Sequence, residues 1–82
     1  MSFSLYWRPV VPVEEHRLPI ELKSLLAKRY WEQDGSLKGG PTTLTSADIA
    51  YLSGLSDAGI KGADELIEAI NKYEAVEIFI EE

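Results

Sequence analysis

The chain has 82 residues, no cysteine, one histidine and a formal net charge of −6. A chain of this length predicts one small globular domain, residues 1–82, and without cysteine it has no disulfide and no thiolate metal ligand. No apolar run approaches the roughly 20 residues that cross a bilayer, and no basic segment followed by an apolar one marks a signal peptide. We therefore expect a cytoplasmic protein that does not engage a membrane.

The charge is divided unevenly along the chain. Residues 1–40 carry six basic against five acidic side chains, a net charge of +1, whereas residues 41–82 carry two lysines against nine acidic side chains, a net charge of −7. Such a balance opposes non-specific binding to nucleic acid, which requires neutralisation of phosphates. It serves solubility, and it also favours a basic protein as partner.

The first predicted element is a strand at the start of the chain, SFSLYWRP, residues 2–9. Apolar side chains alternate here with polar ones, which is typical of a half-buried strand, yet Trp7 and Tyr6 place aromatic rings on both faces. Pro9 and Pro12 lack amide donors and predict a strand edge or exit. The following VEEHRL is expected to be a polar connection.

Apolar side chains at helical spacing predict three helices, over residues 19–31, 45–58 and 62–73. Pro19 suits the first turn of the first helix. Thr45 with Asp48 forms a weak capping box at the start of the second, and Gly59 is a typical residue just after its end. Trp31, at the end of the first helix, is expected to be a lid on the core, with a binding anchor as the less favoured interpretation.

The last segment, EAVEIFIEE, again alternates apolar and acidic side chains and predicts a strand, and PTTLT at 41–45 is a candidate for a short third strand. The predicted fold class is therefore α+β. A small sheet pairs the N- and C-terminal strands, and about three helices pack on one of its faces.

The sequence does not fix the direction of the two terminal strands, but an antiparallel arrangement has one register that matches both faces. Its pairs are Leu5–Ile80, Trp7–Ile78, Ser4–Glu81, Tyr6–Phe79 and Arg8–Glu77. The first two pairs would face the helices and the others the opposite side. A shift by one residue would place glutamates against the apolar face, which excludes it.

This register gathers Tyr6, Arg8, Glu77 and Phe79 on the side of the sheet without helices. Aromatic and arginine side chains that lie together in this way are typical of protein interfaces. The alternative is an aromatic pair that is exposed without a partner, since single exposed aromatic residues are common. We predict that these four residues bind a partner.

The remaining polar motifs do not match catalytic or metal sites. DGSLKGGPTT places its lysine before the glycine pair, unlike a phosphate-binding loop, and EEHR has no second histidine and no cysteine to complete a metal site. His16 with Ser24 or Ser36 matches no nucleophile motif, and so short a chain leaves little room for a substrate cleft. We therefore predict no catalytic residue, no metal and no cofactor.

Two functions from different classes follow. The first is a small acidic protein-interaction module without catalytic activity, an inhibitor, immunity-type protein or adaptor of the kind that bacteria and their phages encode, which binds another protein or a second copy of itself. The alternative is a small nucleic-acid-binding or transcription-regulatory protein that uses the helices in 46–73, with Lys61 near the turn between them. Asp64, Glu65 and Glu68 oppose this alternative, because they would repel phosphate.

Overall fold

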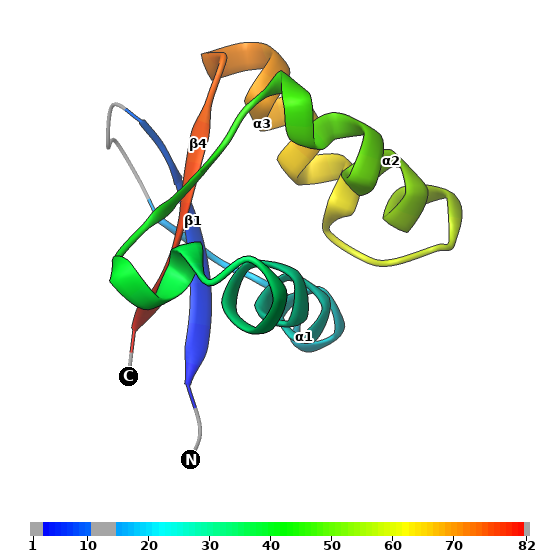
Figure 1. Ribbon diagram of the computed structural model, residues 1–82. Coiled ribbons are helices and arrows are strands. Elements are labelled where there is room, and N and C mark those ends of the chain that lie inside the picture. Colours follow the sequence, from blue (N-terminus) through cyan, green and yellow to red (C-terminus); the bar gives the residue numbers. More distant parts are fainter. Residues whose placement is uncertain (1–2, 11–14, 82) are drawn as a thin grey trace.

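The computed structural model describes residues 3–10 and 15–81. In this part of the chain an antiparallel four-stranded sheet carries helices on one side, so the predicted α+β class is confirmed (Figure 1). The strands are β1 (Ser4–Pro9), β2 (His16–Arg17), β3 (Thr42–Leu44) and β4 (Val76–Glu81), in the sheet order β2-β1-β4-β3. The helices are α1 (Ile20–Ala27), α2 (Ile49–Asp57) and α3 (Ala63–Tyr73).

The two terminal strands form the centre of the sheet, in the predicted register. The partners of β1 and β4 are Ser4↔Glu81, Leu5↔Ile80, Tyr6↔Phe79, Trp7↔Ile78, Arg8↔Glu77 and Pro9↔Val76. The short strand expected near 41–45 is β3, which pairs antiparallel with the other edge of β4. Pro9 ends β1 as expected, whereas the prediction for Pro12 lies outside the described residues.

The segment VEEHRL, expected to be a polar connection, contains the strand β2, so this expectation was wrong. Residues of β2 pair antiparallel with β1, as Tyr6↔Arg17 and Trp7↔His16. The amide of Leu18 then donates to the carbonyl of Leu5 over 2.8 Å, which continues the contact by one more hydrogen bond. Two strand residues are too few to show an alternating pattern, so periodicity could not reveal them.

The first helix changes its winding before it ends. α1 is followed by six residues of π-helix, Lys28–Gln33, and the amide of Asp34 donates to the carbonyl of Arg29 over 2.9 Å. Trp31, in this segment, keeps 39% of its surface exposed and is not part of the core, so the expectation that it covers the core was wrong. The ring of Tyr30, next to it, is the one that is buried.

Capping residues and glycines set both ends of α2 and the start of α3, and the roles of Thr45, Asp48 and Gly59 were predicted. The amide of Thr45 donates to Asp48 Oδ2 over 2.9 Å and forms the predicted capping box, which starts a short 3-10 turn, Ser46–Asp48, ahead of α2. Gly59 follows the C-cap of α2 with a φ of 82°. Gly62 precedes α3 with a φ of 94°, and a Cβ atom there would lie 3.0 Å from Leu22 Cδ2. Both glycines therefore adopt a left-handed backbone conformation that other residues rarely adopt.

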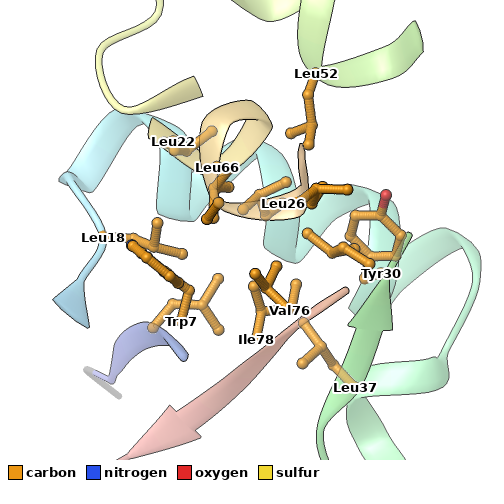
Figure 2. Packing of buried hydrophobic residues seen from close by; sticks show 14 residues of the cluster. Trp7, Leu18, Leu22, Leu26, Tyr30, Leu37, Leu52, Leu66, Val76 and Ile78 are labelled. Carbon is orange, nitrogen blue, oxygen red and sulfur yellow. The ribbon is translucent and has the colours of Figure 1, made fainter. Parts of the chain in front are cut away.

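The hydrophobic core lies between the sheet and the helices, and α2 packs against α3 (Figures 1 and 2). The sheet contributes Leu5, Trp7 and Ile78, which are at most 6% exposed, as predicted for its helix-facing side. The helices contribute leucines and isoleucines, among them Leu22, Leu26, Leu52, Leu66 and Ile70. None of the helices in the described part of the chain is long and apolar enough to span a bilayer.

Candidate functional site

The four residues predicted to bind a partner lie together on the side of the sheet that faces away from the helices. We call Tyr6, Arg8, Glu77 and Phe79 the outer patch. Their side chains alternate along β1 and β4 with those of the core, and all four are half-buried. The rings of Tyr6 and Phe79 stack with their centroids 5.8 Å apart and their planes at 20°. The pair leaves part of each ring exposed, so one aromatic residue shields the other without covering it.

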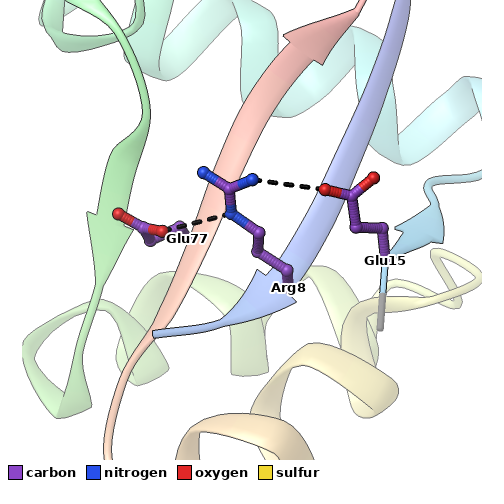
Figure 3. A network of polar contacts seen from close by, with 3 residues as sticks. All are labelled: Arg8, Glu15 and Glu77. Atoms are coloured by element: carbon purple, nitrogen blue, oxygen red, sulfur yellow. Dashed lines mark hydrogen bonds and ion pairs between the residues drawn. The ribbon is translucent and has the colours of Figure 1, made fainter. Parts of the chain in front are cut away.

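Arg8 is the centre of the polar contacts in the outer patch (Figure 3). Its Nε donates to Glu77 Oε1 over 3.2 Å, and one terminal nitrogen lies 3.2 Å from Glu15 Oε2. The guanidinium carbon also lies 4.3 Å from the centroid of the Phe79 ring. Arg8 therefore joins β4 and the residue before β2 to the aromatic pair.

These contacts fix the shape of the patch more than they stabilise the fold. Ion pairs of this exposure contribute about 0–1 kcal/mol each, and an exposed cation–π contact about 0.5–1 kcal/mol. The side chain of Arg8 is 25% exposed and that of Glu15 is 45% exposed, so solvent screens the second pair further. The network holds the planar guanidinium of Arg8 against the ring of Phe79 in one orientation. This pre-organisation lowers the entropy lost when a partner binds.

Sequence reasoning placed all four residues of the outer patch but missed Glu15. It was interpreted only as part of the EEHR motif, whose Glu14 lies outside the described residues. Glu15 reaches Arg8 because β2 folds back along β1, and this pairing was not predicted. Among the described residues no group of three His, Asp or Glu side chains is arranged to hold a metal.

A second cluster, which the sequence did not reveal, joins the π-helical segment to the start of α2. The hydroxyl of the buried Tyr30 donates to Asp48 Oδ1 over 2.9 Å. Burial, together with this hydrogen bond, raises the pKa of Tyr30 to about 12. The Arg29 guanidinium lies 4.1 Å from the centroid of the Tyr51 ring, and the Tyr51 hydroxyl donates to the carbonyl of Leu25 over 3.4 Å.

The pocket beside this cluster has a volume of about 410 Å³ and is lined by Arg29, Tyr30, Gln33, Asp34 and Asp48. Both carboxylate oxygens of Asp48 already accept hydrogen bonds, from the Tyr30 hydroxyl and from the Thr45 amide. The lining offers no nucleophile with an adjacent base. The cluster therefore has a structural role, because it attaches the π-helical segment after α1 to the start of α2.

The nucleic-acid alternative depends on the connection between α2 and α3. Lys61 is exposed there, but Asp64 and Glu65 in the first turn of α3 and Glu68 in the next are exposed as well. The hydroxyl of Ser56 donates to Asp64, which ties the end of α2 to the start of α3. This surface carries one cation beside three carboxylates.

Comparison with known proteins supplies no relative from which a function could be transferred. No family model, no curated protein and no solved structure matches the chain. A function for this protein is therefore argued from its own residues.

Proposed function

We propose that this protein acts by binding another protein through the outer patch, and not by catalysis. The observation that carries the proposal is the stacked pair of Tyr6 and Phe79, which stays partly exposed on the side of the sheet without helices. Aromatic and arginine side chains contribute most of the binding energy in many protein interfaces. The two rings and Arg8 supply this combination on a rigid pair of strands.

The charge of this side of the sheet favours a basic partner. On this side of the sheet the glutamates Glu15, Glu77 and Glu81 outnumber the arginines Arg8 and Arg17. The whole chain carries a net charge of −6. Complementary charge accelerates association with a basic surface and disfavours acidic partners. An acidic inhibitor, immunity-type protein or adaptor fits this description, and a second copy of the chain is the other protein partner that the experiment tests.

The first experiment identifies the partner and then tests the patch. The tagged protein is used to capture partners from a lysate of its source, and the affinity for the captured protein is measured for Tyr6→Ala and Phe79→Ala. We expect each substitution to weaken binding about tenfold or more, because buried aromatic residues at interfaces contribute ~2 kcal/mol or more. Circular dichroism shows whether the variants remain folded.

The matched control is Trp31→Ala, which removes another exposed aromatic ring from a different part of the surface. This variant should bind as the unaltered protein does. Affinities of folded Tyr6→Ala and Phe79→Ala that equal the control would refute the proposal. Sedimentation equilibrium on the purified protein tests self-association with the same variants.

Nucleic-acid binding through residues 46–73 remains the second candidate, and the charges of α3 oppose it. Exposed carboxylates at positions 64, 65 and 68 repel phosphates. Mobility-shift assays with DNA and RNA at low salt test it directly. A shift that disappears at higher salt and in Lys61→Glu would favour this candidate over the outer patch.

A further inference from the structure

A small pocket lies on the other side of the sheet, between β2 and α3. Its volume is about 220 Å³, and its lining includes Trp7, His16, Glu65, Glu68, Lys72 and Tyr73. Trp7 and His16 are partners in the β1–β2 ladder, so their side chains share the helix-facing side. The other four residues form one stripe along α3 together with Ala69, at the spacing i, i+3, i+4, i+7 and i+8.

Aromatic rings form part of the lining. The imidazole of His16 stacks on the indole of Trp7, with centroids 4.5 Å apart and planes at 18°. The ring of Tyr73, which is 36% exposed, lies at the other end of the stripe on α3. The ring of Tyr73 attracts cations through the negative charge of its face, whereas the indole of Trp7 is only 6% exposed and lies against His16. The Tyr73 ring already has a cation beside it, since Lys72 Nζ lies 5.2 Å from the ring centroid.

The carboxylates beside these rings are not neutralised. Glu65 and Glu68 are exposed, and neither forms an ion pair with another residue in the described part of the chain. Lys72 follows Glu68 by four residues, the spacing at which a salt bridge forms on a helix, yet its ammonium lies over Tyr73. The pocket therefore combines two carboxylates that form no ion pair with the partly exposed ring of Tyr73.

We infer that this pocket receives the guanidinium group of one arginine side chain of the basic partner. A guanidinium is planar, stacks on aromatic rings and binds carboxylates through two parallel hydrogen bonds. The volume is below the 300–1,000 Å³ typical of pockets for small molecules, and it suits a single side chain. A metal ion is not favoured, because no described group of three ligands is arranged for one. The inference rests on the proposed function for the nature of the partner, but the pocket itself can be tested without it.

The structure also indicates what the arriving side chain must displace. Lys72 lines the pocket as an internal cation, so it competes with an external cation for the Tyr73 ring and for the negative field of the two glutamates. Removing its charge should therefore strengthen binding. This gain distinguishes a binding site from a merely structural cluster, in which loss of Lys72 would bring no increase in affinity for any cation.

The test is a titration followed by NMR, with N-acetyl-arginine amide as the probe. The chain has two tryptophans, and their indole N–H signals give a reporter and a control in one spectrum, since Trp7 lines the pocket and Trp31 does not. We expect a saturable shift of the Trp7 signal and no saturable shift of the Trp31 signal. N-acetyl-citrulline amide, which has the same shape without the charge, should leave both signals in place.

Three variants complete the design. Glu65→Gln/Glu68→Gln should weaken probe binding about fivefold or more, whereas Glu32→Gln/Asp57→Asn, which removes the same charge elsewhere, should leave it unchanged. Lys72→Gln should strengthen it. Equal shifts with the arginine and citrulline probes, or equal affinities of the two double variants, would overturn the inference.

This outcome is separable from that of the outer patch. Tyr6→Ala and Phe79→Ala alter the opposite side of the sheet, so they should leave the affinity for the arginine probe unchanged. If the probe fails to bind while these variants lose the protein partner, the pocket is refuted and the outer patch stands. If the probe binds while the variants keep the partner, the pocket stands and the outer patch is refuted.

Discussion

Tyr30 shows how one residue couples the stability of the fold to pH. Its pKa is about 12 in the folded protein, because the ring is buried and the hydroxyl donates to Asp48, whereas tyrosine in an unfolded chain has a pKa near 10. The folded state thus favours the protonated phenol. The contribution of Tyr30 to the free energy of unfolding is fully present below about pH 10 and is lost as the pH rises through about 12. The shift corresponds to at most about 3 kcal/mol of stability.

We predict that Tyr30→Phe is less stable than the unaltered protein at neutral pH and loses less stability between pH 10 and 12. At neutral pH the free energy of unfolding decreases by about 1 kcal/mol, because Asp48 Oδ1 loses its hydrogen-bond donor. Urea unfolding at several pH values, for both proteins, measures the two differences. Parallel stability curves across the alkaline range would contradict the assigned role of Tyr30.

At this scale the sequence was informative where a residue belongs to a regular pattern. The alternation in β1 and β4, together with the rule that glutamate does not face the core, was sufficient to place the outer patch. The contact of Tyr30 with Asp48 was not predictable in this way. It joins two helical segments through a π-helical turn, and apolar spacing indicates that a ring is buried without indicating where its hydroxyl points.

At the scale of elements, two glycines allow a matched comparison. Gly54 lies inside α2 with open space where a Cβ would be, whereas at Gly62 a Cβ would lie 3.0 Å from Leu22 Cδ2 and 3.1 Å from the Pro19 ring. Gly62 also has a φ of 94°. We predict that Gly54→Ala stabilises the protein by about 0.5–1 kcal/mol, and that Gly62→Ala destabilises it by roughly 1–3 kcal/mol.

Thermal and urea unfolding of the two variants measure these changes. Both substitutions add the same methyl group, so a difference in sign reflects the place that receives it: a helix interior with free space at Gly54, and a crowded, left-handed helix entry at Gly62. A Gly62→Ala variant as stable as Gly54→Ala would show that the entry to α3 tolerates an ordinary residue.

Elements with several turns or several alternations were predicted from the sequence, and the shortest one was not. α3 follows its predicted span closely, because its apolar stripe and the glycine at its start agree. β2 has two residues, and it exists because β1 leaves an edge that the returning chain can pair with. Such pairing depends on tertiary structure and leaves no periodic trace in the sequence.

For the whole molecule, the sheet separates two surfaces. The outer patch lies on one side, the pocket beside α3 on the other, and β2 borders both. A partner that contacts both must pass over this edge of the sheet. The two surfaces share an excess of carboxylates, so binding of one basic partner to both should weaken as salt increases.

The central position of the two terminal strands has a consequence for how the chain folds. Ser4 and Glu81 are partners, so the ends of β1 and β4 lie side by side although nearly the whole sequence separates them (Figure 1). Closing so large a loop is slow, and during synthesis the sheet lacks the central strand β4 until residues 76–81 have left the ribosome. A circular permutant that joins these ends by a short linker and opens the chain at Gly59 would make the central ladder a local hairpin. We predict that it refolds faster than the natural order in stopped-flow experiments, while its equilibrium unfolding shows the same cooperative transition.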